Sequence, residues 1–312
     1  MHKRTLIKPP ALRKGDTIGI MAPSSRVDKK IVEEAVKGLE AMGFRVYVHP
    51  QTFAYKEQSA GTVEQKIKAL HDLYRNPEIK AIITAKGGNQ AAKLLKLLDY
   101  KLISRHPKIL MGYSDTTILL NAIQAKTGVV TFHGPMVGRL GRDLPPAQRR
   151  QCLDLLTGKT ADINMPRAKV LKAGSISGRL VGGNLSLIVN LLGTPFQPDF
   201  RNAILFIEDA FDELSRYDRM LAHLGNAGAL DQISGLIAGS FTHSGDNGVL
   251  PFGRTVAEII RSHTDRLDIP AVIDAPFGHG KDLYTLPVGA KARLTAQRGK
   301  CALRLDGPAV SR

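Results

Sequence analysis

The chain has 312 residues, of which 43% are hydrophobic and 23% charged. This composition is that of an ordinary soluble globular protein, and the length predicts about two domains. It excludes a disordered chain, a collagen-like repeat and a disulfide-stapled miniprotein. Cys152 and Cys301 lie far apart without a CxxC spacing. We therefore expect free thiols in a reducing compartment.

Charge is the unusual property of the chain. Lys and Arg number 44 against 28 Asp and Glu, which gives a net charge of +16. Such an excess is compatible with nucleic-acid binding. The basic residues are scattered, however, and aromatic residues make up only 5% with no Trp, so surfaces for base stacking are scarce. We expect no nucleic-acid partner and favour an acidic small-molecule substrate.

The sequence carries no targeting or membrane signal. The segment MHKRTLIKPPALRKGD is positively charged but lacks the apolar core of a secretory signal. No stretch approaches the roughly 18 apolar residues that a membrane span requires. The sequence therefore predicts a cytoplasmic protein with no membrane partner.

Short apolar runs alternate with helical patterns in the first half of the chain. Strands are expected at 17–22, 45–49, 79–85 and 108–113, and helices at 31–42, 63–74, 90–98 and 116–125. Alternation of this kind predicts a parallel sheet covered by helices on both faces, with right-handed crossovers.

The pattern changes around residues 157–176, which contain turn formers and little helical period. Beyond them, strands are expected at 203–207, 236–240, 271–273, 291–296 and 300–305, and helices at 185–192, 217–224 and 256–263. Gly299 marks a hairpin turn between the last two strands. We expect an N-terminal α/β domain over 1–160, a linker over 161–176 and a strand-rich α/β domain over 177–312.

The segment KILMGYSDTT, residues 108–117, holds the strongest local signal. An apolar strand runs into Ser114, and a helical pattern begins directly behind it. This is the geometry of a nucleophile elbow, in which the amide of the next residue, Asp115, lies at a helix start and can stabilise an oxyanion. The match to GxSxG is imperfect because Thr116 replaces the second glycine. The alternative is that Ser114 only caps the helix.

A nucleophilic serine needs a base. Of the nine histidines, His133, His243 and His279 lie at predicted strand ends, where parallel sheets place their sites. Gly278 and Gly280 flank His279 and let its backbone approach a cleft closely. The alternative for His279 is an ordinary turn histidine.

Glu208 is the candidate acid, since a carboxylate directly after the buried run ILFI is costly unless it has a partner. Asp209 competes with it, and a helix cap is the simpler explanation for one of the two. Ser114, Glu208 and His279 follow one another in an order that a catalytic triad allows, although many unrelated chains share it.

The segment Lys86-Gly87-Gly88-Asn89 follows a predicted strand. Its glycines let backbone amides approach a ligand, so the amide of Gly88 is a candidate for the second donor of an oxyanion hole. The alternative is an ordinary turn. GxGxxG, the phosphate-binding GxxxxGK[ST] and HExxH are all absent from the sequence, so we expect no cofactor and no metal.

Together these segments resemble the LD-carboxypeptidase (muramoyl-tetrapeptide carboxypeptidase) family of serine peptidases. The resemblance extends across some 260 residues, through short motifs in a shared order. These are Lys14-Gly15-Asp16, Ala22-Pro23-Ser24, Lys86-Gly87-Gly88, Leu98-Asp99-Tyr100, Pro107-Lys108, Gly112-Tyr113-Ser114-Asp115, His133-Gly134-Pro135-Met136, Gly182-Gly183-Asn184-Leu185, Gly193-Thr194-Pro195, Glu208-Asp209 and Gly278-His279-Gly280.

The resemblance implies an enzyme of peptidoglycan recycling that removes the terminal D-Ala from an L,D-linked muropeptide tetrapeptide, without a metal. It implies a flavodoxin-like N-terminal lobe, similar to class I amidotransferases, a strand-rich C-terminal lobe and a homodimer. On this pattern Ser114 is the nucleophile, His279 the base and Glu208 its orienting acid. The amides of Asp115 and Gly88 form the oxyanion hole.

The chain departs from the family in one loop. Where the family usually reads Arg-Gly-Gly-Tyr-Gly, this chain reads Lys86-Gly87-Gly88-Asn89-Gln90. A bidentate guanidinium thus becomes a point charge, which changes anchoring of a carboxylate or of the loop. Lys86 and Asn184 are candidates for gripping the terminal carboxylate of the substrate, or else for bracing loops. The preferred third residue of the stem peptide and any need for its sugar stay open.

Two other functions remain as alternatives. The microcin C immunity peptidases share the triad and cleave acyl-sulfamoyl or acyl-phosphoramidate adenylates, but they stack adenine on aromatic side chains. This chain has no aromatic residue between Phe132 and Phe196, which weighs against such a site. The second alternative is a non-catalytic small-ligand-binding protein on the same scaffold.

Overall fold

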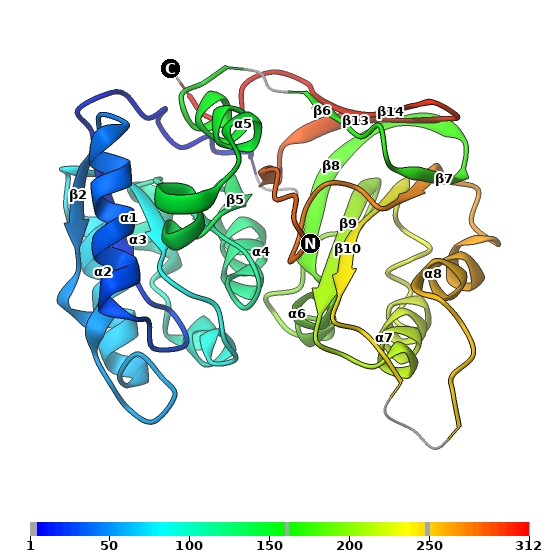
Figure 1. Cartoon of the computed structure of the whole chain (residues 1–312), viewed down its shortest axis with the longest axis horizontal. Helices are drawn as coiled ribbons and strands as arrows, with labels where there is room; N and C mark the ends of the chain where they lie inside the picture. Colours follow the sequence, from blue (N-terminus) through cyan, green and yellow to red (C-terminus); the bar gives the residue numbers. More distant parts are fainter. Residues whose placement is uncertain (1–4, 160–161, 247–249, 312) are drawn as a thin grey trace.

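The computed structural model of the chain describes residues 5–159, 162–246 and 250–311. Two lobes lie side by side, each built around one β-sheet (Figure 1). Among the described residues, no helix is both long and apolar enough to cross a bilayer.

The N-terminal sheet has the strand order β12-β5-β4-β3-β1-β2. Its strands are β1 (Thr17–Met21), β2 (Arg45–Val48), β3 (Ile79–Thr84), β4 (Ile109–Gly112), β5 (Thr131–His133) and β12 (Leu286–Val288). Strands β1 to β5 are parallel, and β12 pairs antiparallel with β5. The order 2-1-3-4-5 of the parallel strands is that of flavodoxin, which confirms the expected fold class of this lobe.

Helices cover both faces of this sheet (Figure 1). They are α1 (Lys29–Ala41), α2 (Val63–Arg75), α3 (Tyr100–Arg105), α4 (Thr116–Thr127) and α5 (Pro146–Leu156). Helix α4 is buried on nearly every side, because its apolar residues share one core with side chains of the second lobe such as Phe206. Residues 90–98, expected as an α-helix, instead form the 3-10 helix η2 (Ala91–Leu97), whose first amide is held by a side chain of the elbow.

The C-terminal sheet has the strand order β6-β14-β13-β8-β9-β10-β11-β7. Its strands are β6 (Ile163–Asn164), β7 (Lys169–Lys172), β8 (Gly174–Asn184), β9 (Ala203–Ala210), β10 (Gly235–Thr242), β11 (Ala271–Ile273), β13 (Lys291–Gln297) and β14 (Lys300–Leu305). Strands β8 to β11 are parallel, and antiparallel strands flank them on both sides. Helices α6 (Leu185–Asn190), α7 (Leu214–Asn226) and α8 (Val256–Thr264) contribute to the core on one face. The hairpin expected at Gly299 is present, with Gly299 at φ +75° between β13 and β14.

Strand β8 was not expected from the sequence, because its many glycines disfavour a strand. The structure explains one of them at Gly182. That residue has φ +145°, and a Cβ there would collide with the carbonyl oxygen of Phe206 on β9. Glycine therefore serves the close approach of two backbones in this strand and does not mark a turn.

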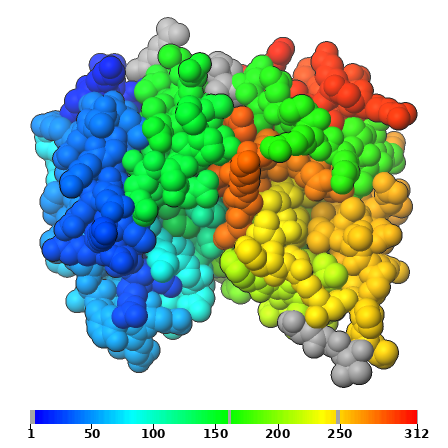
Figure 2. Space-filling view, viewed as in Figure 1, coloured from blue at the N-terminus to red at the C-terminus, as the bar shows by residue number. Residues whose placement is uncertain are grey.

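The two lobes are joined by more than one crossing of the chain. Strand β12 leaves the second half of the sequence to complete the N-terminal sheet. Near the C-terminus, Ser311 pairs with Pro9 and Ala11 of the N-terminal segment. Figure 2 shows the orange residues that follow β11 lying along the line where the lobes meet. This boundary brings the carboxyl ends of strands from both sheets close together.

Candidate active site

Ser114 occupies the turn between β4 and α4, with φ +58°. A left-handed serine is strained, and such strain is a property of nucleophile elbows. The Ser114 carbonyl accepts a hydrogen bond from the Thr117 amide at 2.8 Å, but its hydroxyl has no hydrogen-bond partner in the described part of the chain. Asp115 holds the N-cap position of α4. The Ser114 hydroxyl therefore does not cap helix α4.

The buried Asp115 carboxylate holds the loop that follows β3. It accepts hydrogen bonds from the backbone amides of Gln90 and Ala91, both at 2.9 Å. The same loop lies so close to the nucleophile elbow that a Cβ on Gly87 would be 2.9 Å from Ser114 Oγ. Sequence reasoning considered only the Asp115 amide, and it missed that the side chain positions the neighbouring loop.

Two backbone amides beside Ser114 are free to donate. The amides of Gly88 and Asp115 make no hydrogen bond within the residues that the structure describes. Gly88 has φ +143°, and a Cβ there would strike the hydroxyls of Ser24 and Ser25, so only glycine fits. Free amides beside a hydroxyl are the geometry that an oxyanion hole requires.

Glu208 and His279 form a buried pair on the second lobe. The Glu208 side chain, two residues before the end of β9, is fully buried, and its Oε2 lies 2.7 Å from His279 Nδ1. The same oxygen accepts the His279 backbone amide at 3.2 Å. The contact with the carboxylate places the Nδ1 proton between the two groups, which leaves Nε2 to act on a substrate or nucleophile.

The electrostatics of this pair follow from its burial. Removal from water raises the pKa of Glu208, against the opposing hydrogen bond and charge of His279. Burial by itself lowers the pKa of His279, but the hydrogen bond and the charge of Glu208 outweigh it, so the pKa of His279 is raised. A nearby carboxylate thus stabilises the imidazolium, as a general base requires during proton transfer.

The loop carrying His279 is held from the second lobe. Ser240 Oγ accepts the Gly280 amide at 2.9 Å and donates to the Phe277 carbonyl at 3.0 Å. Gly278 has φ +106°, and a Cβ there would lie 2.7 Å from the Glu208 side chain. Gly278 is therefore required for the close approach of the loop to Glu208.

Helix α5 of the N-terminal lobe holds the same loop from the other side. The Gln148 side chain donates to the Asp282 carboxylate at 2.8 Å and accepts the Leu283 amide at 2.9 Å. The Gln151 side chain makes two corresponding hydrogen bonds with the Thr285 backbone, both at 2.9 Å. No local motif marks these two glutamines, because their partners lie more than 130 positions away.

The two halves of the site meet at Tyr113. The centroid of its ring lies 5.0 Å from that of His279, in an edge-to-face arrangement. Since Tyr113 directly precedes Ser114, the imidazole lies on the same side of the molecule as the hydroxyl. No hydrogen bond joins Ser114 and His279 in the described part of the chain. Catalytic hydrogen bonds are often long without substrate and shorten when it binds.

The other two histidines at strand ends have different surroundings. His133 is fully buried, and neither ring nitrogen has a hydrogen-bond partner among the described residues. Burial lowers the pKa of His133 to about 3, with a smaller effect from His279. His243 is exposed and stacks on Phe211. The structure therefore brings only His279 to a carboxylate of the site.

Asp209, the competing acid, makes no hydrogen bond with His279 among the described residues. Its carboxylate accepts hydrogen bonds from Asn184 Nδ2 at 2.9 Å and from the Ser186 amide and hydroxyl at 2.9 and 2.6 Å. This contact orients Asn184 so that its buried Oδ1 is left without a partner among the described residues. Lys86 is exposed and forms no ion pair in that same set.

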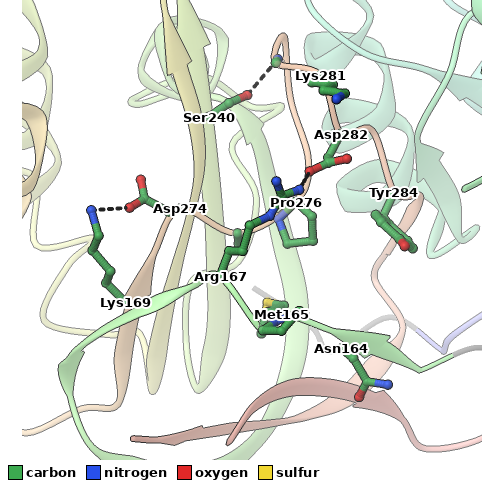
Figure 3. Close-up of a pocket in the computed structure, with 13 residues that line it drawn as sticks. Asn164, Met165, Arg167, Lys169, Ser240, Asp274, Pro276, Lys281, Asp282 and Tyr284 are labelled. Carbon is green, nitrogen blue, oxygen red and sulfur yellow. Dashed lines mark hydrogen bonds and ion pairs between the residues drawn. The ribbon is translucent and has the colours of Figure 1, made fainter. Parts of the chain in front are cut away.

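A pocket of about 500 Å³ adjoins the loop that carries His279 (Figure 3). Ser240 and Gly280 contribute to its lining, and Ser240 holds the loop in the view shown. Two ion pairs stand at its rim, Lys169–Asp274 and Arg167–Asp282. Neither Ser114 nor His279 lines this pocket, so it neighbours the candidate site without containing the reacting groups. Among the described residues, no group of three His, Cys, Asp or Glu is placed to hold a metal ion.

A strained serine on a flavodoxin-like lobe, opposite a carboxylate–histidine pair on a second lobe, is the arrangement of a serine-type peptidase. Profiles of two known domains match the chain. The LD-carboxypeptidase N-terminal domain matches residues 18–134, and the LD-carboxypeptidase C-terminal domain matches residues 177–294. The chain belongs to the LD-carboxypeptidase family, as the sequence motifs indicated.

Individual relatives cover nearly the whole chain. A probable murein peptide carboxypeptidase from Bacillus subtilis (strain 168) is 36% identical over 301 residues, covering 93% of this chain and 92% of the relative. A structure of MccF in complex with glutamyl sulfamoyl guanosine matches with a TM-score of 0.89 and 26% identity, over 98% of this chain and 100% of that one. Muramoyltetrapeptide carboxypeptidase from Oxalobacter formigenes matches with a TM-score of 0.85 and 29% identity, over 94% and 99%.

Proposed function

We propose that this protein is a serine LD-carboxypeptidase that hydrolyses the bond to the terminal D-Ala of murein tetrapeptides in peptidoglycan recycling. The main support is the 2.7 Å contact between Glu208 Oε2 and His279 Nδ1, which lies beside the nucleophile elbow of Ser114. The carboxypeptidase names of the relatives from Bacillus subtilis and Oxalobacter formigenes support this substrate class.

In the proposed reaction, Ser114 Oγ attacks the carbonyl of the penultimate residue while His279 Nε2 takes its proton. Glu208 holds the imidazole in the required tautomer and stabilises the imidazolium that forms. His279 then returns the proton to the amine of the departing D-Ala. Water repeats the sequence on the acyl-enzyme and releases the shortened peptide.

The free amides of Gly88 and Asp115 are suited to bind the oxygen of the tetrahedral intermediate. Both belong to segments that the Asp115 carboxylate ties together, so the two donors are positioned before substrate arrives. Loss of one such donor typically lowers the rate about 100- to 1,000-fold. Backbone amides supply the oxyanion hole, so it does not depend on the side chains that differ from the family's usual loop sequence.

Lys86 and Asn184 are the proposed substrate-binding residues, with different roles. The exposed ammonium of Lys86 suits the terminal carboxylate of a tetrapeptide. Asn184 Nδ2 already donates to Asp209, whereas the buried Asn184 Oδ1 has no hydrogen-bond partner among the described residues. A buried acceptor without a partner is costly, so Asn184 is proposed to accept an N–H of the bound peptide.

The test is incubation of the purified protein with a murein tetrapeptide and detection of released alanine by mass spectrometry. Alanine release by the wild type and its loss in Ser114→Ala support the proposal. A removal of serine or base costs on the order of a million-fold in a well-studied triad. Release that persists in Ser114→Ala contradicts the assigned nucleophile.

A second candidate function is that of the microcin C immunity peptidases, favoured by the TM-score of 0.89 to MccF with a bound sulfamoyl nucleoside. The same experiment, run with an aminoacyl-sulfamoyl adenosine, separates the two. Cleavage of the adenosine compound without alanine release favours the second function. Failure to turn over either compound leaves a non-catalytic binding protein.

The setting of the enzyme is also proposed, on the family resemblance and on two buried free thiols, Cys152 and Cys301. We place it in the cytoplasm as a homodimer, with domains over 1–160 and 177–312 and a linker over 161–176, of which β6 and β7 pair into the C-terminal sheet. Cell fractionation tests the location, analytical ultracentrifugation the dimer, and limited proteolysis the linker. No nucleic-acid, membrane, metal or cofactor partner is proposed.

A further inference from the structure

Two aromatic rings stand exposed at the carboxyl edge of the second sheet. Phe211 follows β9 directly and His243 follows β10 directly. Their rings stack in parallel, with centroids 4.5 Å apart and an interplanar angle of 6°. Phe211 is nevertheless 74% exposed, and His243 is exposed as well. The pair therefore presents a flat apolar surface to solvent.

The backbone under this pair is strained. Phe211 has φ +62° and His243 has φ +52°, and the Phe211 amide donates to the Thr242 carbonyl at 3.0 Å. The left-handed region is unusual for a bulky residue such as phenylalanine. Burial of the phenyl ring would offset the free energy of the left-handed backbone, but this ring is exposed to water. Uncompensated strain of this kind concentrates at binding and catalytic sites.

The pair lies within reach of the candidate active site. Phe211 is three residues beyond Glu208, and three residues of extended chain span at most about 10 Å. Both rings leave the carboxyl ends of parallel strands, the edge at which such sheets bind ligands. In a murein tetrapeptide, three residues likewise separate the scissile bond from the sugar, a comparable distance of about 10 Å.

We propose that Phe211 and His243 form a platform for the sugar ring of a muropeptide. The apolar C–H face of a pyranose packs against an aromatic ring, which makes Phe211 a specificity-determining residue for substrates that retain their sugar. This inference rests on the proposed function. We infer a contact that is made equally with the substrate and the transition state, which lowers KM and leaves kcat unchanged.

The test compares a tetrapeptide bearing N-acetylmuramic acid with the same peptide lacking the sugar. Phe211→Asn removes the ring while asparagine tolerates the left-handed backbone, so the variant should fold at least as well as the wild type. We expect KM for the sugar-bearing peptide to rise about fivefold to tenfold, the range of a lost aromatic contact. Kinetics on the sugar-free peptide should stay within about twofold. Phe211→Trp should retain the preference.

Tyr47→Ala is the matched control, since Tyr47 is a part-exposed aromatic residue on β2, the far edge strand of the other sheet. It should leave both substrates unaffected. The platform is wrong if the wild type has equal kinetics on the two peptides, or if Phe211→Asn keeps the preference for the sugar-bearing peptide. In either case, alanine release by the wild type still supports the peptidase function.

Calorimetry in the Ser114→Ala background reads the platform without turnover. There the dissociation constant of the sugar-bearing peptide should rise when Phe211→Asn is added, and that of the sugar-free peptide should not. If instead only the affinity for an aminoacyl-sulfamoyl adenosine falls, the platform binds a nucleobase and the assignment to a sugar is wrong.

Discussion

The buried, unpartnered imidazole of His133 predicts how the free energy of unfolding depends on pH. Its imidazole is fully buried between the lobes, edge-to-face with Phe206 and Phe277 at centroid distances of 5.5 and 6.2 Å. Neither ring nitrogen has a partner among the described residues. The perturbation is His133→Phe, which keeps a ring in this aromatic cluster and removes the titratable group.

The magnitude follows from the pKa of His133, which burial lowers from 6.5 to about 3. Below pH 6.5 the unfolded chain binds a proton at this residue that the folded protein does not, so acid destabilises the fold. Each pH unit contributes up to about 1.4 kcal/mol. The wild type should therefore lose about 2 kcal/mol through His133 between pH 6.5 and pH 5, and about 4 kcal/mol between pH 6.5 and pH 3.

The assay is urea unfolding of the wild type and His133→Phe at pH 7, 6 and 5. Any cost of fitting the larger ring is independent of pH, whereas the difference between the two proteins should shift in favour of the variant by about 2 kcal/mol from pH 7 to pH 5. Titration of other groups is common to both proteins and cancels. A difference that stays constant across this range refutes the reasoning, because it means that the folded protein protonates His133 as readily as the unfolded chain.

Three further predictions concern the candidate site. Glu208→Gln places an amide against His279 Nδ1 and favours the wrong tautomer, so kcat should fall about 10,000-fold. Without the carboxylate the pKa of His279 falls, so the acid limb of the residual pH–rate profile should move to lower pH. An acid limb that does not move contradicts the pairing of Glu208 with His279. Gly87→Ala brings a Cβ to 2.9 Å from Ser114 Oγ and should lower kcat at least tenfold with little change in Tm. Gly225→Ala, where the added Cβ would make only ordinary contacts at 3.8 Å, should leave kcat unchanged. Gln148→Leu removes two hydrogen bonds to the loop of His279 and should lower the free energy of unfolding by roughly 1–3 kcal/mol. We also expect a lower kcat for the variant molecules that remain folded. Equal kcat in the folded variant and the wild type contradicts a positioning role for Gln148.

Much of the N-terminal lobe was predictable because its signals are local. The strand at Ile79–Thr84 is apolar apart from Lys80 and Thr84, and the helix at Val63–Arg75 has apolar residues on one face and a capping box at its start. Both patterns report which backbone conformation buries the apolar side chains. The nucleophile elbow at Ser114 is legible for the same reason, since strand, serine and helix are contiguous in the sequence.

Elements that depend on distant partners were missed or altered. Strand β12 is only three residues long and exists because it pairs with β5, more than 150 positions earlier. Strand β8 has a glycine at position 182 because the backbone of β9 approaches it closely there. The segment at Ala91–Leu97 has an apolar helical pattern, yet hydrogen bonds from the Asp115 carboxylate hold its start and it forms a 3-10 helix.

The candidate site divides along the same line. From the sequence alone, Ser114 could be recognised at a turn, Glu208 after a buried strand and His279 between glycines, and the shared order of motifs identified the family. Their meeting was not encoded in any local window. It results from two sheets packing on helix α4 and from Gln148 and Gln151 holding the loop of His279. Local sequence determines backbone conformation and burial, whereas only the packing of both lobes brings side chains from distant segments to hydrogen-bonding distance.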